Sequence, residues 1–376
     1  MEYIFYIIGA VLILATAMPL IKADAWWIRV FDFPRLQILI LAAVTAVFFL
    51  LVIGLPDTVA IIFAALLLIC LVYQLYMMFP YTRLARVQVE DHKRDDPENF
   101  LSVLFANVLM ENRQSAGLKQ QIEQLDPDVI LLAETDNWWQ LEMDYLEDKR
   151  PHTLKYPQDN TYGLLLYSRL ELVDAEINFL VQSDIPSFHG RLKLRSGRAV
   201  EFRCLHPRPP VPSEDSRSTP RDAEILIVGR ENRDNSLPFV VFGDLNDVAW
   251  SRTNYLFQNV TGLLDPRIGR GFYHTFHAGI PLFRFPLDHL FHSNHFRLVD
   301  FRRLEYFGSD HFPVYIKLSL EADAVITQEE LTPTEEELAE AEEKMAFVHE
   351  PPEVREADPV VIPGFGDEPA ADSPQT

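Results

Sequence analysis

The sequence predicts an α/β domain that follows three transmembrane helices. Two observations lead to this prediction. The first 80 residues contain three long apolar runs without a charged side chain, and residues 100–320 alternate short apolar runs with segments of helical periodicity. Alternating strand and helix patterns are typical of an α/β fold with parallel strands. The 376 residues therefore divide into a membrane anchor (1–80), a linker (81–99), a domain (100–320) and an acidic tail (321–376).

The anchor is predicted from the length of its apolar runs, Tyr3–Ile21, Leu36–Leu55 and Val59–Pro80. Each run is close to the roughly 20 residues that a helix needs to cross a bilayer. Glu2 stands where a signal peptide would carry positive charge, so we do not expect cleavage. The lipid bilayer is thus the first predicted partner.

Basic residues indicate which side of the membrane the domain faces. Lys22, Arg29 and Arg35 lie in the first connection, and Arg83 and Arg86 follow the third span. The N-terminus and the second connection contain none. The positive-inside rule therefore places the domain in the cytoplasm.

Residues 81–99 are interpreted as a solvated linker because Glu90–Glu98 reads EDHKRDDPE. Beyond it, Leu118, Ile122 and Leu125 recur at helical spacing and give one apolar helix face. Short runs rich in apolar residues predict buried strands, and these are Leu101–Phe105, Val129–Ala133, Gly163–Tyr167, Ala199–Leu205, Phe239–Phe242 and Val314–Leu320.

Polar side chains follow several of these strands. Asn107 and Glu134 end two successive strands that are joined by a helix. If the two strands are parallel neighbours, both side chains lie at one edge of the sheet. A carboxylate in that position is a suitable ligand for a hard cation, although it also suits a turn.

The stretch FVVFGDLNDV, Phe239–Val248, has the clearest pattern of this kind. Gly243 breaks the apolar run, and Asp244 and Asn246 follow it with one residue between them. Alternate side chains of an extended chain point the same way, so both would enter one pocket. The carboxylate suits water activation and the carboxamide suits an anionic oxygen. The alternative is an ordinary strand-ending turn.

Histidines complete the candidate set. His206 follows the strand Ala199–Leu205, and Asp288 opens another apolar run. Asp310 and His311 are adjacent in a loop, where they suit a metal ligand and an imidazole base. His274 and His277 could form a metal pair, but an aromatic loop over a pocket explains them equally well.

Charge and cysteine content exclude some classes of protein. Of the net charge of -22, residues 321–376 contribute -15, which leaves a mildly acidic body of -7. Such a body argues against binding nucleic acid through phosphate neutralisation. Cys70 and Cys204 imply no disulfide framework. The tail is predicted to be disordered, except that Thr334 and Glu337 could form a capping box that opens a helix to about Val348.

The order of these motifs resembles the endonuclease/exonuclease/phosphatase family. The resemblance covers about Phe100–Leu320, and its most specific parts are the GD-x-N and SDH motifs. The three spans resemble the bacterial membrane branch that includes vancomycin- and teicoplanin-resistance-associated proteins. The resemblance implies a four-layer α/β sandwich of two packed mixed sheets and a multi-pass location in the inner membrane. It also suggests an extracytoplasmic domain, so the side of the membrane stays open.

The resemblance also implies a role for each motif. Glu134 would be the main Mg²⁺ ligand, with Asn107 and Asp310 nearby and Mn²⁺ as an alternative ion. Asp244 would orient or deprotonate the attacking water, and Asn246 would contact the phosphate. The imidazoles around the scissile phosphate would be those of His206 and of His311, the latter held by Asp288. Arg191 and Arg208 are further candidates for phosphate contacts.

The sequence therefore predicts a membrane-anchored, Mg²⁺-dependent hydrolase of phosphate esters. A metal-dependent nuclease is the alternative enzyme, and an inactive membrane scaffold is the alternative from another class. The phosphorylated substrate stays open among lipid pyrophosphates, phospholipids, nucleotides and nucleic acid, and the oligomeric state stays open too.

Overall fold

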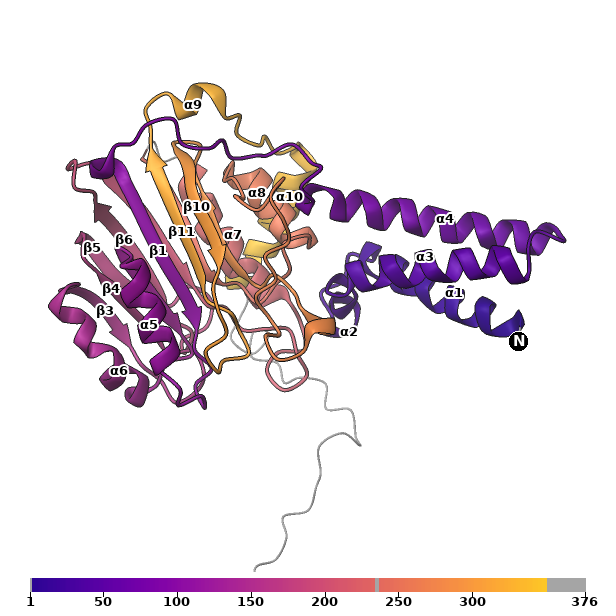
Figure 1. Ribbon diagram of the computed structural model, residues 1–376, viewed down its shortest axis with the longest axis horizontal. Coiled ribbons are helices and arrows are strands. Elements are labelled where there is room, and N and C mark those ends of the chain that lie inside the picture. The colour runs from indigo at the N-terminus through magenta and orange to yellow at the C-terminus, as the bar shows by residue number, and fades with distance from the viewer. Residues whose placement is uncertain (1, 234–236, 350–376) are drawn as a thin grey trace, which may run out of the picture.

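The computed structural model describes residues 2–233 and 237–349, and Figure 1 shows a layered domain with three long helices projecting from one side. The strands of the domain are β1 (Phe100–Asn107), β2 (Val129–Ala133), β3 (His152–Tyr156), β4 (Leu164–Ser168), β5 (Glu171–Asn178), β6 (Ser187–Lys193), β7 (Ala199–Leu205), β8 (Phe239–Asp244), β9 (Asp288–His292), β10 (Phe296–Arg303) and β11 (Val314–Leu320). Its helices are α5 (Ala116–Leu125), α6 (Asn137–Met143), α7 (Thr219–Arg233), α8 (Arg252–Thr261), α9 (Ala324–Thr327) and α10 (Glu335–Ala346).

Two mixed sheets form the centre of the domain. One has the strand order β10-β11-β1-β2-β4-β3 and the other β5-β6-β7-β8-β9. Strands β1 and β2 are parallel, as are β7 and β8, and the other neighbours are antiparallel. The two sheets pack face to face through buried side chains such as Phe105 and Leu131 on one and Phe202 and Phe242 on the other.

Helices cover the outer face of each sheet. Leu118 and Ile122 of α5 and Trp139 of α6 pack on the six-stranded sheet. Helices α7, α8 and α10 pack on the five-stranded sheet, for example through Leu226 and Phe257. The predicted four-layer α/β sandwich is therefore confirmed, and the apolar face predicted for residues 118–125 is the one that α5 buries.

The two parallel pairs bring four strand ends together in the way that the sequence predicted. Asn107 of β1 is in register with Ala133, the residue before Glu134. Leu205, the residue before His206, is in register with Gly243, the residue before Asp244. Strand β9 runs antiparallel to β8, so its first residue, Asp288, lies opposite Asp244.

The N-terminal helices are α1 (Glu2–Ala17), the short α2 (Trp26–Arg29), α3 (Arg35–Val52) and α4 (Thr58–Met78). Three segments are long and apolar enough to cross a membrane, and they are Tyr3–Leu20, Arg35–Val52 and Thr58–Tyr81. They coincide closely with the three predicted spans. Figure 1 shows α1, α3 and α4 running side by side away from the domain.

The connection between α1 and α3 docks on the domain. The Trp26 amide donates to the Ser216 carbonyl at 3.0 Å, and the Trp250 indole N–H donates to the Asp32 carbonyl at 2.7 Å. At the end of α4 the Tyr81 hydroxyl donates to the Ala249 carbonyl at 2.6 Å. These contacts place the first connection and the exit of the third span on the same side as the domain.

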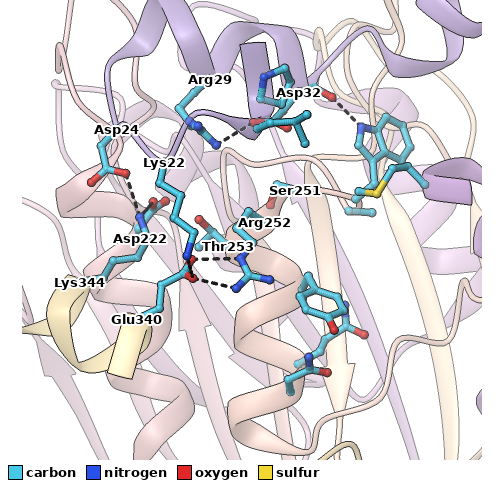
Figure 2. A pocket seen from close by; sticks show the side chains of 18 of the residues that line it. Lys22, Asp24, Arg29, Asp32, Asp222, Ser251, Arg252, Thr253, Glu340 and Lys344 are labelled. Atoms are coloured by element: carbon cyan, nitrogen blue, oxygen red, sulfur yellow. Dashed lines mark hydrogen bonds and ion pairs between the residues drawn. The ribbon is translucent and has the colours of Figure 1, made fainter. Parts of the chain in front are cut away.

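A cavity of about 1240 Å³ lies at this junction, between the anchor, α7, α8 and α10. Figure 2 shows Glu340 of α10 beside Lys22 of the anchor and Arg252 of α8, at 3.4 Å and 2.7 Å. Lys344 lies between Asp24 and Asp222, at 2.9 Å from each. The predicted catalytic residues do not line this cavity, which instead joins three distant parts of the chain.

The run 90–98 is a mostly exposed loop, as its charges predicted, but the linker is not detached from the domain. Val89 is fully buried, and the backbone of Glu90 and His92 hydrogen-bonds with Leu298 of β10. Arg297, which has no exposed side-chain surface, pairs with Glu90 at 3.0 Å. The sequence did not predict the contacts of Val89 and Glu90, because their partners are distant in the sequence.

The prediction of disorder is also wrong for the first part of the tail. Glu321 is buried and pairs with Arg297 at 2.5 Å, and Ala341 and Met345 of α10 join the core beneath the five-stranded sheet. The predicted capping box of Thr334 and Glu337 is confirmed at the start of α10. Residues 350–376 lie outside the described residues.

Candidate active site

The ends of β1 and β2 bring Asn107 and Glu134 into direct contact. The Asn107 amide nitrogen donates to Glu134 Oε1 at 2.7 Å and to Asp244 Oδ2 at 3.1 Å. Its amide oxygen accepts the Leu109 N–H at 3.0 Å. Glu134 has a φ of 58°, a left-handed conformation that is uncommon outside glycine and is often found at functional sites. Asn107 therefore links the carboxylates at the ends of two sheets.

Gly243 allows β8 to approach β7 closely just before Asp244. Its φ is 149°, and a Cβ at this position would lie 1.9 Å from the Leu205 carbonyl oxygen. Only glycine fits there, which explains the first residue of the GD-x-N pattern. Asp244 Oδ1 then accepts the Asn246 N–H at 2.9 Å, and the Asn246 carboxamide donates to the Pro207 carbonyl at 2.9 Å. Asp244 and Asn246 therefore form a strand-ending turn, and this turn also fixes the positions of their side chains in the candidate site.

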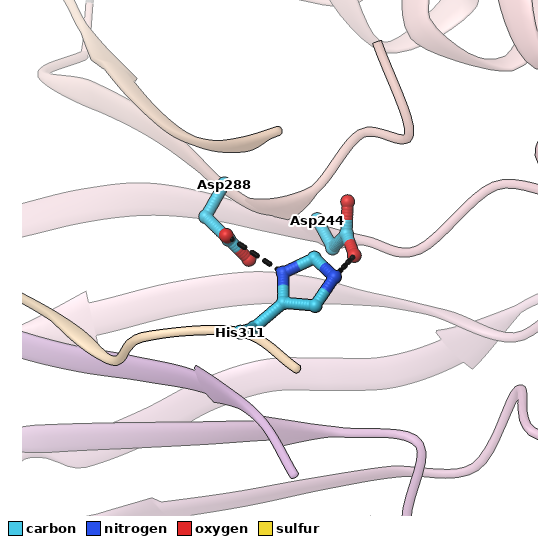
Figure 3. A group of neighbouring side chains, drawn as sticks. All are labelled: Asp244, Asp288 and His311. Atoms are coloured by element: carbon cyan, nitrogen blue, oxygen red, sulfur yellow. Dashed lines mark hydrogen bonds and ion pairs between the residues drawn. The ribbon is translucent and has the colours of Figure 1, made fainter. Parts of the chain in front are cut away.

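His311 lies between two buried aspartates, as Figure 3 shows. Its Nδ1 is 2.9 Å from Asp288 Oδ2, and its Nε2 is 3.5 Å from Asp244 Oδ2. The Ser309 hydroxyl donates to the Asn107 carbonyl at 2.8 Å and accepts the His311 N–H at 3.0 Å. The loop that carries His311 is thereby fixed to the end of β1.

The two histidines of the site differ in charge. Burial lowers the pKa of His311, but the carboxylates of Asp288 and Asp244 outweigh it and raise that pKa to about 10. Burial dominates at His206 and lowers its pKa to about 4. At neutral pH the site therefore contains one imidazolium and one neutral imidazole. The buried Nδ1 of His206 has no partner among the described residues, so it is available to a ligand.

Carboxylates gather around Glu134. Its pKa is raised to about 7, first by burial and then by repulsion from Asp310 and Asp244, although Asn107 and His311 oppose the shift. Burial also raises the pKa of Asp244. A divalent cation would relieve the repulsion between these oxygens, and clustered carboxylate oxygens suit hard cations. Side-chain nitrogen and oxygen atoms of Asp244, Asp288 and His311 also lie within 4.8 Å of one another, but the protonated His311 has no nitrogen lone pair to offer a cation.

The two predicted arginines have different positions. Arg208 stacks over the Tyr162 ring, which in turn contacts the His206 ring at 5.4 Å, so Arg208 lies at the rim of the site. Arg191 of β6 is in register with Glu201, five residues before His206, and pairs with Asp174 on the outer strand β5. The structure does not bring Arg191 to the site, because β6 carries it away from the edge where the predicted residues meet.

Three contributors were not predicted from the sequence. Arg221 is buried, contacts Asp222 and Asp247, and donates to the Asn246 carbonyl at 2.8 Å. The Thr275 hydroxyl accepts the Asp288 N–H at 3.3 Å, and the Phe276 ring lies 5.0 Å from the His311 ring. None of them follows a predicted strand, which was the signal that identified the other residues.

A family model described as the Endonuclease/Exonuclease/phosphatase family matches residues 104–311, more than half of the chain. The matched region begins in β1 and ends at His311, so it includes every predicted site residue. No curated protein matches the chain.

Solved structures with the same fold include humanized TDP2 of D. rerio, with 14% identity and a TM-score of 0.47 over 59% of this chain and 99% of that one. The human Nocturnin catalytic domain with bound sulfate anion has 14% identity and a TM-score of 0.49 over 64% and 98%. A mannosyl-6-phosphatase of Bacteroides thetaiotaomicron has 18% identity and a TM-score of 0.46 over 58% and 99%.

Proposed function

Because the chain belongs to the endonuclease/exonuclease/phosphatase family, we propose that it is a membrane-anchored, metal-dependent hydrolase of phosphate esters. The observation that supports this most is the connected set Glu134–Asn107–Asp244–His311–Asp288, which joins the ends of both sheets through hydrogen bonds and ion pairs. The three apolar helices support a multi-pass location in the inner membrane and a place in the bacterial membrane branch.

We propose Mg²⁺, with Mn²⁺ as an alternative, held by Glu134 and Asp310. The mutual repulsion of Glu134, Asp310 and Asp244 supports this placement, since oxygen ligands and excess negative charge suit these ions. Such an ion would supply charge neutralisation for the phosphate oxygens. The ligand role of Asn107 stays a prediction, because in this structure its amide oxygen accepts the Leu109 N–H.

The residues of the chain would divide the remaining work. Asp244 would orient the attacking water and accept its proton. The cationic His311, whose Nδ1 is held by Asp288, would donate one hydrogen bond from Nε2 to the phosphate and stabilise its developing negative charge. The neutral His206 would offer its unpartnered nitrogen to the substrate or to the leaving oxygen. Environments that push the pKa values of two groups apart are typical of acid–base sites.

Asn246 and Arg208 would position the phosphate. One N–H of the Asn246 carboxamide is used by Pro207, which leaves the other for an anionic oxygen. Arg208 pairs with Asp184 at 2.6 Å at the rim of the site. The mildly acidic body favours the phosphoesterase over the nuclease, and the complete catalytic set favours both over an inactive scaffold.

The test uses the full-length protein purified in detergent and bis-p-nitrophenyl phosphate as the probe. We expect hydrolysis that is lost in EDTA and restored by Mg²⁺ or Mn²⁺. We also expect Asp244→Asn to lower the rate of hydrolysis by about 10²-fold or more. Hydrolysis that is insensitive to EDTA, or an Asp244→Asn variant with wild-type turnover, would overturn the proposal.

A further inference from the structure

The loop Phe272–Phe285, called the aromatic loop here, connects the membrane anchor with the active site. On the anchor side, the Gln37 carboxamide donates to the Leu282 carbonyl at 2.8 Å, and the rings of Phe33 and Phe285 meet at 5.6 Å. Figure 1 shows the orange segment around residue 280 beside α2, at the base of the projecting helices. The loop is thus held against the first turn of α3.

The tip of the aromatic loop is apolar and exposed. Ile280, Leu282 and Phe283 have 45%, 68% and 51% of their surface exposed. Such side chains are costly in water when they form a patch. Gln37, which holds Leu282, is the third residue of a helix that is long and apolar enough to cross a membrane. The tip therefore lies at the depth where α3 would enter the bilayer.

The other side of the aromatic loop forms part of the site wall. The Ala278 amide donates to the Asp310 carbonyl at 2.6 Å, and the Phe312 amide donates to the Thr275 carbonyl at 3.0 Å. The Phe276 ring contacts the His311 ring at a tilted angle, and the Thr275 hydroxyl accepts the Asp288 amide N–H. Phe276, which contacts His311, is only four residues before Ile280, the first residue of the apolar tip.

Positive charge accompanies the apolar tip. Arg284 and Arg303 both stack on the Phe312 ring, at 5.0 Å and 4.4 Å, and neither forms an ion pair within residues 2–233 and 237–349. Arginines without an acidic partner beside an apolar tip suit a surface of anionic lipid headgroups, which attracts cations.

We propose that the aromatic loop inserts Ile280, Leu282 and Phe283 into the bilayer and holds the mouth of the active site at headgroup level. The substrate is then a phosphate ester of a membrane lipid, which reaches the site without leaving the bilayer. This inference rests on the proposed function for its chemistry, but membrane insertion of the loop can be measured without activity.

The kinetic test compares two diesters with the same leaving group, methyl p-nitrophenyl phosphate in solution and hexadecyl p-nitrophenyl phosphate in vesicles. In both reactions the water oxygen bonds to phosphorus and p-nitrophenolate leaves. The full-length protein is reconstituted in vesicles of phosphatidylcholine and phosphatidylglycerol. The test variant carries Ile280→Ser, Leu282→Ser and Phe283→Ser. The matched control carries Leu141→Ser, Val325→Ser and Ile326→Ser, which change exposed apolar side chains on α6 and α9, away from the anchor.

We expect the loop variant to lose about tenfold or more of its rate on the hexadecyl ester, since exposed apolar surface drives insertion. Its rate on the methyl ester and both rates of the control should stay within about twofold of wild type. Equal losses on both esters, or no loss on either, would overturn the inference.

A second readout separates this inference from the proposed function. Cys70 and Cys204 are buried, so a fluorophore can be attached selectively at Leu282→Cys, with Leu141→Cys as the control. Doxyl-labelled lipids should quench the fluorophore at residue 282 and not that at residue 141. If the protein hydrolyses neither ester but residue 282 is quenched, the proposed chemistry fails and the bilayer contact stands. Equal quenching at the two positions would overturn the bilayer contact, whatever the activity.

Discussion

At the scale of single residues, the site depends on side chains whose charges are set by their neighbours. His206 follows a predicted strand and His311 lies in a predicted loop, and the structure places both near Asp244. The sequence could not assign their charge, because the pKa of His311 depends on Asp244 and Asp288, which come from other strands. The prediction for Arg191 failed for a related reason, since the strand that carries it away from the site was not recognised.

The pairing of His311 with Asp288 predicts that their substitutions are not additive. An aspartate that orients and charges an imidazole loses this role once the imidazole is gone. We expect His311→Ala and Asp288→Asn each to cost about 10²-fold or more in kcat/KM, with the double variant hardly worse than His311→Ala. The measurement is kcat/KM of the four proteins on one chromogenic diester.

A control for this cycle combines Asp288→Asn with His295→Ala, because His295 contacts Ser293 rather than the site. Those two effects should multiply. If the His311 and Asp288 losses also multiply, the hydrogen bond between them has no catalytic role.

At the scale of helices and strands, the number of apolar residues in a segment decided which strands could be predicted. Strands β2, β7 and β11 were predicted with their observed bounds, although only β2 is a continuous apolar run and β7 and β11 each contain charged or polar residues. Strands β3 and β5 were missed because their residues are mostly half-buried or exposed, so neither a continuous run nor a clean alternation marks them. The order of the first part of the tail was missed because its acidic residue Glu321 is buried in an ion pair with Arg297.

The contacts of Arg297 indicate how much stability the domain would lose if the tail were removed. Arg297 is buried and pairs with Glu321 and Asp323 as well as with Glu90. Removal of residues 321–376 would leave this guanidinium without two of its partners, Glu321 and Asp323. It would also expose the apolar core surface that Ala341 and Met345 of α10 cover. We expect a loss of about 3 kcal/mol or more in the free energy of unfolding.

The comparison protein for this deletion ends at His349 and keeps every described contact of α10. Thermal unfolding of the two proteins in the same detergent decides the point. Matching midpoints would show that the tail helix does not stabilise the domain.

The linker sets the boundary of a stable soluble fragment. A fragment that starts at Arg86 keeps Val89, which is fully buried, and the Glu90 carbonyl that accepts the Leu298 N–H at 2.9 Å. A fragment that starts at Asp91 loses both. We expect both fragments, ending at His349, to be soluble without detergent, with the shorter one less stable by about 2 kcal/mol.

Denaturant unfolding of the two fragments measures this difference. Equal midpoints would show that the linker adds nothing to the domain, and recovery of either fragment only with detergent would place the end of the anchor later in the chain.

At the scale of the whole molecule, the anchor and the domain form one unit rather than two parts on a tether. Tyr81, Trp250 and Phe272 pack together where α4 ends, and the strand β8 that carries Asp244 continues within a few residues into this cluster. The edge that carries the candidate site is therefore held at a defined position relative to the three candidate spans. The sequence predicted the spans and the site separately, but not this contact, because no local pattern reports on packing between distant segments.

The central claim is that the strand-end cluster is a metal-dependent hydrolytic site, and a metal titration of full-length protein tests it most directly. Protein stripped with EDTA would be titrated with Mg²⁺ while hydrolysis of bis-p-nitrophenyl phosphate is followed, for wild type, Glu134→Ala and the exposed control Glu147→Ala. We expect saturable recovery for wild type and the control, and a loss of about 10²-fold or more for Glu134→Ala with its thermal midpoint preserved. Wild-type turnover of Glu134→Ala at saturating Mg²⁺ would contradict the account.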